Sequence, residues 1–366
     1  MPRATRFFVG LTEVGHYTHY LARGLRELGF PVTRVVWASG APSLQGGAGA
    51  DRCLARSWNP RLRAFRGFRE FLRQAFRHDV FIFNYSESFL GPFAVGGRTG
   101  VLTYADMRAL AGIGKKVMAV VHGPDLRSVP HLVGEMEAAG LGSQARWLAS
   151  EWAAAPSHAG READLRRKAR RLEAVADIVL ARPNAAQFLA RPRLLRLPFD
   201  PASVSCPERE SGRPRVIHAP TNPLVKGTRF VREAVERLRA EGLDFEFEEC
   251  RNMPHARVLE RLETSEIVVD QVLSPNYGFL AIEAMAAGNV VLSGAVPGLF
   301  GCPPDSPLVP VSPDTLADRL RGILADRKGR RERGLRGREF VERHHHYRDV
   351  ALEVAEMAAA PRAIHD

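Results

Sequence analysis

The sequence predicts an α/β protein of two lobes, each built on a parallel sheet, with a cleft between the lobes. Short apolar runs alternate with amphipathic helical segments along most of the chain, which is the pattern of parallel strands joined by right-handed crossovers. The alternation is interrupted over residues 199–214, which are rich in proline, serine and charge, and then resumes. With 366 residues, the chain is long enough for two cores of ordinary size.

In the first half, each expected strand is a short apolar run. Strands are expected at 7–10, 32–38, 80–84, 116–122 and 178–181, with a further short one near Leu195. Helices are expected over 16–28, 104–110 and 162–175. The first of these helices ends at Gly29, a residue suited to the left-handed conformation that follows a helix. Residues 1–198 form the expected N-terminal domain.

The second half repeats this rhythm. Strands are expected at 216–218, 245–249, 267–270, 290–293 and 308–311, and helices at 229–241, 313–344 and 349–360, with a short helix that carries Glu283. The expected organisation is therefore a linker at 199–214, a C-terminal domain at 215–345, and a last helix at 346–366 that packs back on the N-terminal domain.

The net charge of the chain is +11 and its pI is near 10.0. Such an excess of cations indicates an anionic partner, and charge alone leaves a nucleotide-sugar, an anionic membrane and a nucleic acid open. No recognised DNA- or RNA-binding module accompanies the basic residues. We therefore expect no nucleic-acid partner.

A cytoplasmic protein without a metal site is expected. No apolar run approaches the ~20 residues that span a bilayer, and the N-terminus has no apolar region of the signal-peptide kind. The four cysteines are far apart and form no CxxC pair, which indicates reduced thiols. Three consecutive histidines, at 344–346, would point in different directions, so they predict no metal site.

Two segments, 218–230 and 275–291, each contain a strand-end loop that leads into a helix. Loops in this position offer backbone N–H groups and the positive end of a helix dipole to a phosphate. In the first segment, Lys226 can reach a phosphate and Gly227 lets the backbone approach a ligand. The alternative is a solvated turn lysine, which the position before an amphipathic helix disfavours.

In the second segment, Glu283 is surrounded by small or apolar residues in a short helix. A carboxylate in such a buried helix needs a partner, and the hydroxyls of a ribose are a fitting one. The alternative is a glutamate near a helix N-terminus that interacts with the dipole, worth ~0.3–1 kcal/mol.

The Lys226-Gly227 turn and the pattern Tyr-Gly-x4-Glu-Ala-Met-Ala-x-Gly-x-Val-Val at 277–291 resemble the retaining glycosyltransferases of the GT-B fold, in particular the family 4-like enzymes. The resemblance covers most of residues 216–293, and in the first lobe only the rhythm of strands and helices. It implies two Rossmann-like doubly wound domains facing a cleft. It also implies transfer of a hexose from a nucleoside diphosphate-sugar, most simply a UDP-sugar, with retention of configuration and with no metal or cofactor.

The resemblance implies a donor site in the second domain and an acceptor site in the first. Lys226 would hold the donor diphosphate and Glu283 the ribose. The further expected donor contacts are Gly15, Thr221, Asn222, Gly227, Tyr277, Gly278, Phe279 and Leu280. The acceptor class stays open among a glycan, a lipid-linked molecule and a protein.

His122 is the expected catalytic residue of the first domain, because a histidine in this place of the family faces the transferred sugar. It would stabilise developing charge or the acceptor hydroxyl. The alternative is a turn histidine capped by Asp125 and Arg127. At the end of the preceding strand, three polar residues are candidates for the acceptor side: Asn84, Ser86 and Glu87.

The chain departs from the family pattern at two places. The first of two glutamates would fall at Pro275, and Asp270, five residues upstream, is the candidate substitute and second catalytic residue. The arginine that precedes the lysine is absent, and Thr221 and Asn222 occupy its region; neutral donors hold a phosphate more weakly. These departures leave two alternatives open: a nucleotide-sugar-binding protein without catalysis, and an epimerase or hydrolase on the same architecture.

Residues 61–77 predict a basic amphipathic helix. An apolar stripe at helical spacing is formed by Leu62, Phe65, Phe68, Leu72 and Phe76. It is flanked by five arginines: Arg63, Arg66, Arg69, Arg73 and Arg77. The commoner arrangement buries the phenylalanines inside the domain and leaves the arginines in solvent. The alternative is a helix that lies on an anionic membrane surface.

Overall fold

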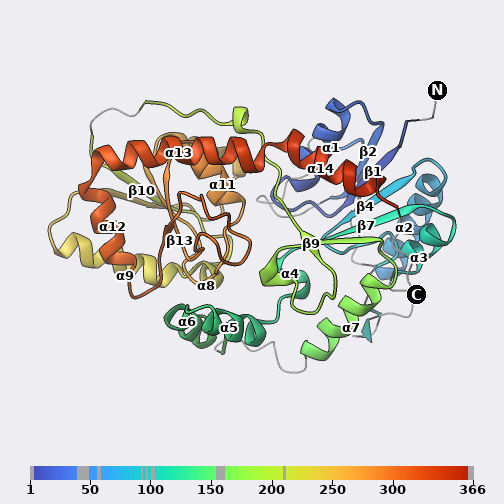
Figure 1. Ribbon diagram of the computed structural model, residues 1–366, viewed down its shortest axis with the longest axis horizontal. Helices are drawn as coiled ribbons and strands as arrows, with labels where there is room; N and C mark the ends of the chain where they lie inside the picture. Colours follow the sequence, from blue (N-terminus) through green and yellow to red (C-terminus); the bar gives the residue numbers. More distant parts are fainter. Residues whose placement is uncertain are drawn as a thin grey trace. The chain divides into compact units, whose positions relative to one another are not determined.

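A computed structural model of the protein describes residues 4–38, 49–55, 59–91, 94–95, 98–99, 104–153, 161–208 and 212–361 (Figure 1). Its contacts divide the chain into two compact units. Unit 1 comprises Met1–Arg127, Gly160–Pro198 and Tyr347–Asp366, and unit 2 comprises Ser128–Ala159 and Phe199–His346. Neither unit is one continuous stretch of chain.

Unit 1 is built on a seven-stranded sheet in which all neighbours run parallel. In spatial order the strands are β3 (Arg52–Leu54), β2 (Val32–Trp37), β1 (Phe7–Leu11), β4 (Val80–Asn84), β7 (Lys116–Val121), β8 (Ile178–Ala181) and β9 (Arg193–Leu194). Every residue of β1 and β4 is buried, as expected of a parallel sheet covered on both faces. The chain order reverses at β1, which places a topological switch point between β1 and β4.

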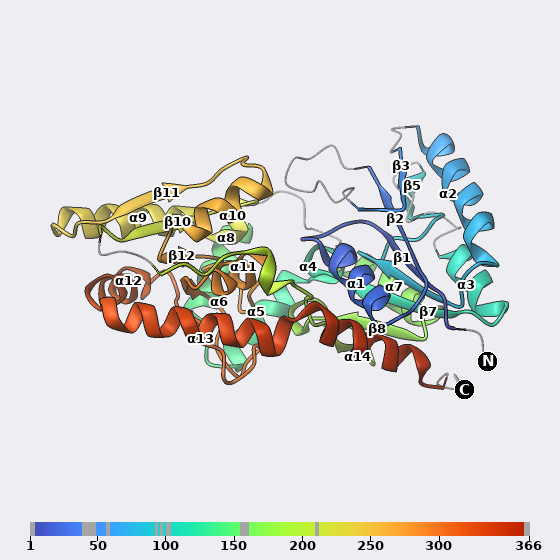
Figure 2. The same ribbon diagram turned by 90° about the horizontal axis from the view of Figure 1, so that it is seen from above.

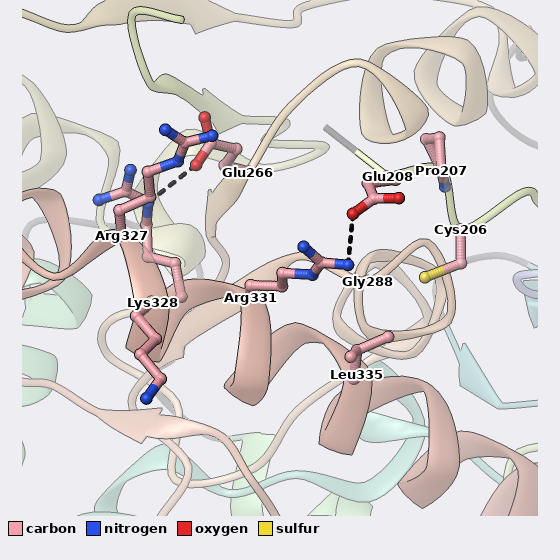
Figure 3. Close-up of a pocket in the computed structure, with 10 residues that line it drawn as sticks. Cys206, Pro207, Glu208, Glu266, Gly288, Arg327, Lys328, Arg331 and Leu335 are labelled. Atoms are coloured by element: carbon pink, nitrogen blue, oxygen red, sulfur yellow. Dashed lines mark hydrogen bonds and ion pairs between the residues drawn. The ribbon is translucent and has the colours of Figure 1, made fainter. Parts of the chain in front are cut away.

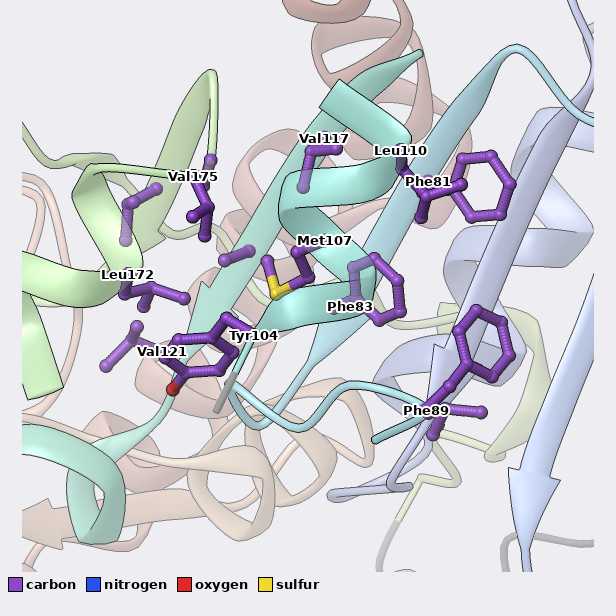
Figure 4. Close-up of a cluster of buried hydrophobic side chains, with 14 of the residues drawn as sticks. Phe81, Phe83, Phe89, Tyr104, Met107, Leu110, Val117, Val121, Leu172 and Val175 are labelled. Atoms are coloured by element: carbon purple, nitrogen blue, oxygen red, sulfur yellow. The ribbon is translucent and has the colours of Figure 1, made fainter. Parts of the chain in front are cut away.

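Helices cover the sheet of unit 1. They are α1 (Tyr17–Glu27), α2 (Pro60–Ala75), α3 (Ala105–Gly112), α4 (Gly123–Leu126), α7 (Arg161–Glu173) and α14 (Tyr347–Ala359), with a small hairpin of β5 (Ala94–Val95) and β6 (Arg98–Thr99). The main core lies between one sheet face and the helices α3 and α7, where Phe81, Phe83 and Val121 meet Met107 and Leu172 (Figure 4).

The last helix, α14, packs along α1 within unit 1 (Figure 2). The approach is close, because a methyl group at Gly24 would lie 2.6 Å from Cβ of Ala351. At one end, the Tyr347 hydroxyl donates to both oxygens of Glu27, at 2.9 and 2.7 Å. The C-terminal helix thus belongs to the same unit as the N-terminal strand.

Unit 2 has a five-stranded parallel sheet. Its spatial order is β11 (Glu246–Glu249), β10 (Arg215–His218), β12 (Ile267–Val269), β13 (Val290–Ser293) and β14 (Val309–Pro310). The helices are α5 (Val129–Ala138), α6 (Gly142–Ala153), α8 (Pro223–Lys226), α9 (Thr228–Ala240), α10 (His255–Glu263), α11 (Phe279–Ala286), α12 (Leu316–Ala325) and α13 (Arg327–His345). The chain order reverses between β10 and β12, so the switch point of this sheet lies there.

Most of the expected elements are confirmed. The strands agree with the structure to within one residue at each end, and most helices to within two. The sequence analysis missed β3, α5, α6 and α10, and also the short helices α4 and α8 and the hairpin of β5 and β6. It was wrong to expect one helix over 313–344, because α12 ends before Asp326, whose carboxylate caps α13 by accepting from the N–H of Gly329 at 2.8 Å.

Unit 1 differs from the expected domain 1–198 because it includes α14 and lacks the segment of α5 and α6, which belongs to unit 2. Its apolar residues Leu132 and Leu148 share a core with Phe230 and Leu273. In addition, Nε2 of Gln144 donates to the carbonyl oxygens of two residues that follow β12 and β13, Val272 at 3.0 Å and Gly294 at 3.1 Å. Both carbonyls are deep in unit 2, so this glutamine anchors the segment there.

The helix α13 runs closely across α11 (Figure 1). A methyl group at Gly334 would overlap with the carbonyl oxygen of Gly288, which follows α11.

We expect Gly334→Ala to destabilise unit 2 by ~1–3 kcal/mol and to lower its thermal midpoint, because backbone atoms cannot easily give way. The matched control is Gly322→Ala in α12, where nothing lies within 4 Å of the added carbon; it should stabilise the helix by ~0.5–1 kcal/mol. Equal shifts in the two variants would contradict this packing.

Candidate functional site

Lys226 and Asp270 form an ion pair at the switch point of the unit 2 sheet. Asp270 directly follows β12 and is fully buried, and Nζ of Lys226 donates to its Oδ1. The lysine side chain is 12% exposed. No residue that the structure describes hydrogen-bonds the other oxygen, Oδ2. The pair therefore keeps a cation and an acceptor at the edge where α/β sheets bind ligands.

The short helix α8 determines where Lys226 lies. Asn222 begins the turn: its Oδ1 accepts from the N–H of Leu224 at 3.1 Å, and its carbonyl accepts from the N–H of Lys226 at 3.0 Å. Gly227 then takes a left-handed conformation with φ of 70°, and its Cα faces Val272 closely enough that a methyl group would lie 3.2 Å from that side chain. Thr221 and Asn222 are exposed. The expected residues of this loop are thus brought together.

His218, at the end of β10, holds this edge of the sheet together. Burial lowers its pKa to about 4, so the ring is neutral. Nδ1 lies 2.8 Å from the carbonyl oxygen of Val269, to which it donates, and Nε2 then accepts from the Thr228 hydroxyl at 2.9 Å. This histidine links β10, β12 and α9, and its role is to position the loop that carries Lys226.

Glu283 has a protein partner that the sequence analysis missed. The glutamate lies in α11 and is 4% exposed, and its Oε1 is 2.8 Å from Nε2 of His255, the first residue of α10. Burial lowers the pKa of His255, but the hydrogen bond and charge of Glu283 outweigh burial, so the pKa lies above its ordinary value of 6.5. The sequence gives only a slight indication of this partner: His255 starts a helix shortly after β11, a strand of the unit 2 sheet.

The loop before α11 is held by its own polar side chains. Gln271 donates to Asn276, and the Ser274 hydroxyl donates to Oδ1 of Asn276 at 2.6 Å. Pro275, at the position of the missing glutamate, is buried among them. No side chain that the structure describes caps α11 at Gly278, whose backbone is extended. The first backbone N–H groups of α11 are therefore not capped by a side chain of the described residues.

Tyr277 points into unit 2. Its side chain is almost fully buried, with the hydroxyl 3.0 Å from Nε2 of His345 and the ring edge-on to Phe340. It packs α13 against the loop. The next three residues, Gly278, Phe279 and Leu280, are half-buried. A donor contact by Tyr277 would have to come from its backbone, and the donor roles of all four residues stay predictions.

In unit 1, His122 follows β7 and is a buried neutral histidine. Burial, and then the charge of Arg182, lower its pKa to about 4. Its Nε2 donates to Oδ1 of Asn84 at 2.8 Å, and Nδ2 of Asn84 donates to the Thr12 carbonyl at 2.6 Å. The Asp125 carboxylate accepts from the His122 N–H at 2.9 Å, as the capped-turn alternative requires. A neutral ring can still serve as a hydrogen-bonding group, so the catalytic role stays a prediction.

The other residues suggested for the acceptor side form internal hydrogen bonds. The Ser86 hydroxyl donates to Asp125 at 2.9 Å, and Glu87 accepts from Thr12 and pairs with Arg63. These bonds order the carboxyl edge of β4. They leave the acceptor assignment as a prediction.

The loop of Gly15 is dominated by a buried carboxylate, Glu13. Glu13 accepts from the N–H groups of Val14 and Thr18 at 3.0 Å each, from that of His19 at 3.2 Å, and pairs with the buried Arg34 at 2.7 Å. Donors at the start of α1 are therefore turned toward the protein. A diphosphate at Gly15 would compete with Glu13 for them, and this role of Gly15 stays a prediction.

A cavity of about 490 Å³ lies elsewhere in unit 2 and contains none of the expected donor residues (Figure 3). It is lined by Cys206, Pro207, Glu208, Glu266, Gly288, Arg327, Lys328, Arg330, Arg331 and Leu335. Glu266 and Gly288 precede their strands, so the cavity is at the amino edge of the sheet. Two of its arginines are in ion pairs, Arg330 with Glu266 at 2.8 Å and Arg331 with Glu208.

Residues 229–356 match a family model described as glycosyl transferase-like. This range contains His255, Asp270 and Glu283. The whole chain is also similar in structure to known proteins. The chain has the GT-B fold. Within the described residues, no group of three metal-binding side chains occurs, and no helix there is long and apolar enough to cross a membrane.

Three solved structures illustrate the similarity. Sucrose-phosphate synthase from Thermosynechococcus elongatus has 17% sequence identity and a TM-score of 0.64, over 97% of this chain and 98% of that one. Anabaena HepE in complex with UDP-glucose has 12% identity and a TM-score of 0.60, over 97% and 99%. WaaG, a glycosyltransferase involved in lipopolysaccharide biosynthesis, has 12% identity and a TM-score of 0.55, over 98% and 100%. None of the curated proteins compared with the chain matches its sequence.

The pair of His255 and Glu283 predicts a pH dependence. The pKa of His255 is higher in the folded protein than its ordinary value of 6.5, which applies in the unfolded chain. The pair therefore contributes its full stabilisation at pH values below 6.5, and this stabilisation is lost as pH rises through the pKa of the folded protein. We expect the difference in thermal midpoint between the native protein and His255→Asn to shrink as pH rises above about 6.5.

The control for this experiment is His344→Asn. His344 also contacts a carboxylate, Asp305 at 3.0 Å, but the two side chains are 30% and 42% exposed, so the loss of this contact should cost little at any pH in the range. A constant difference for His255→Asn across the range would show that the pair carries no net charge interaction.

Proposed function

We propose that the protein is a glycosyltransferase that moves a hexose from a nucleoside diphosphate-sugar to an acceptor with retention of configuration and without a metal. The observation that carries the proposal is the arrangement of Lys226, Asp270 and Glu283 at the carboxyl edge of the unit 2 sheet, inside or beside the range that matches the glycosyl transferase-like family. UDP is the proposed nucleotide, and HepE, which shares the fold, was solved with UDP-glucose.

The proposed donor geometry uses the charges that the site already holds. Lys226 would neutralise the leaving diphosphate, and the backbone donors at the start of α11 would add to it, so no metal is required for that task. Glu283 would accept from the ribose hydroxyls in place of His255. The unoccupied oxygen of Asp270 would accept from a hydroxyl of the donor sugar, the task that a glutamate at 275 would otherwise have.

A second candidate function is nucleotide-sugar binding without transfer, and Pro275 favours it. The buried proline supplies no carboxylate beside the sugar, and Asp270 is already engaged by Lys226. Turnover separates the two functions, because both predict donor binding and only one predicts release of the nucleotide. We further propose a cytoplasmic location, supported by four free cysteines; the acceptor class stays open.

We expect UDP to raise the thermal midpoint of the protein, because a ligand that binds only the folded state adds about 2.7 kcal/mol to its stability at a hundred times the Kd.

In Glu283→Gln, the amide nitrogen, which is a donor, would face a ribose hydroxyl that also donates. The affinity for UDP should therefore fall by ~1–3 kcal/mol. The loss should be smaller for 2′-deoxy-UDP, which lacks one of the two hydroxyls. His255→Asn is the matched control: it removes the partner of Glu283 and leaves the carboxylate, so it should retain UDP binding. No shift with any nucleoside diphosphate would refute the proposal.

The Lys226–Asp270 pair requires a double variant. Lys226→Ala alone strands a buried carboxylate, which costs about 3–5 kcal/mol of stability and would obscure any effect on binding. In Lys226→Ala/Asp270→Asn the buried charge is gone too, and we expect a loss of ~1.5–3 kcal/mol for UDP with little loss for uridine. Asp270→Asn, which keeps the lysine, should bind UDP normally but release it from a UDP-sugar far more slowly.

Equal losses for uridine and UDP would show that Lys226 only supports the fold. Undiminished turnover in Asp270→Asn would show that Asp270 only holds the lysine. If neither the native protein nor any variant releases UDP although UDP binds, the non-catalytic function is favoured.

A further inference from the structure

The helix α2 carries a continuous apolar stripe on the outside of unit 1. Of the nine large hydrophobic side chains that are exposed in the described part of the chain, five are on this helix or at its C-cap: Leu62 (41%), Phe65 (61%), Phe68 (46%), Leu72 (50%) and Phe76 (74%). The expectation that these phenylalanines pack inward is therefore wrong. The other four exposed side chains are scattered over different elements, so this stripe is the one concentrated apolar surface that the described residues form.

The opposite face of α2 fixes the helix to unit 1. Gly67 lies so close to the carbonyl oxygen of Phe89 that a side chain would not fit. Glu70 is almost fully buried and pairs with Arg52 at 2.9 Å and with Arg73 at 3.4 Å, and Gln74 donates to it at 2.6 Å. These contacts determine the rotation of the helix, and that rotation turns the stripe outward.

Along residues 60–77, the charged side chains beside the stripe are arginines. Glu70 is the one acidic residue of residues 60–77, and it lies on the buried face. Arg61, Arg69 and Arg77 are exposed, and none of them makes an ion pair with a residue that the structure describes. Both figures that show the whole chain place α2 at the periphery of unit 1 (Figures 1 and 2). The surface thus combines bulky apolar groups with uncompensated positive charge.

We propose that α2 docks this protein on an anionic lipid surface. The five apolar side chains would enter the boundary between headgroups and acyl chains, and Arg61, Arg69 and Arg77 would bind lipid phosphates. A lipid surface fits better than a protein groove because the stripe runs along a straight helix for four turns and needs a flat, deformable partner. The inference does not rest on the proposed transfer activity. If both hold, the lipid-linked class becomes the preferred acceptor.

The test is co-sedimentation of the full chain with vesicles of phosphatidylcholine, with or without phosphatidylglycerol. We expect binding to the anionic vesicles and release as salt is raised, since salt screens the arginines. Phe65→Ser/Phe76→Ser should weaken binding about tenfold or more, and Arg69→Glu about fivefold or more. Because these side chains are exposed, the variants should keep the native thermal midpoint and the same shift with UDP.

The matched controls are Ile113→Ser and Leu352→Ser, which remove exposed apolar side chains of unit 1 (49% and 45%) outside α2; both should bind like the native protein. The proposal fails if the native protein does not bind anionic vesicles, if it binds neutral vesicles equally well, or if the controls lose as much binding as the α2 variants. Self-association of the chain that Phe65→Ser/Phe76→Ser abolishes, without vesicle binding, would assign the stripe to a second copy instead.

Discussion

A buried carboxylate needs a partner, and this requirement organises both units at the carboxyl edges of their sheets. In unit 2, Asp270 is held by Lys226 and Glu283 by His255. In unit 1, Glu13 is held by Arg34 and by the N–H groups at the start of α1. Removing one partner from such a pair costs about 3–5 kcal/mol. Each edge is therefore ordered before any ligand arrives, by charges that the chain itself supplies.

Under the proposed function, donor binding is an exchange of partners. A ribose that donates to Glu283 would release His255, and a diphosphate would share Lys226 with Asp270. The sugar hydroxyl that satisfies Oδ2 of Asp270 would compensate for that sharing. In unit 1, Glu13 already accepts from backbone N–H groups at the start of α1. A phosphate there would therefore gain fewer hydrogen bonds than in unit 2. The balance of these exchanges assigns most of the nucleotide recognition to unit 2, where the family match also lies.

Local pattern was sufficient to predict most of the strands, their order along the chain and the loops that carry Lys226 and Glu283. What depends on packing between distant segments could not be predicted. Nothing near residue 255 shows that its ring reaches Glu283. Gln144 is far in the sequence from the sheet of unit 2, yet its side chain donates to carbonyls that follow β12 and β13. Tyr277 belongs to the glycine loop by sequence but is drawn inward by His345, a residue 68 positions away. The missing glutamate at Pro275 and the candidate substitute Asp270 were both evident from the sequence, whereas the ion pair of Asp270 with Lys226 required the structure.

The helix α2 shows why an amphipathic pattern does not by itself reveal which face is buried. Its phenylalanines supply most of the apolar area, and on that ground they would turn inward. The rotation is decided by two smaller features, a glycine that permits backbone contact with Phe89 and a glutamate that must reach Arg52.

The net charge of +11 is similarly uninformative until paired and unpaired cations are separated. Arg330 and Arg34 neutralise buried or half-buried carboxylates within the fold, whereas the exposed arginines of α2 have no such task. Part of the charge available to an outside partner therefore lies where the apolar surface is also exposed.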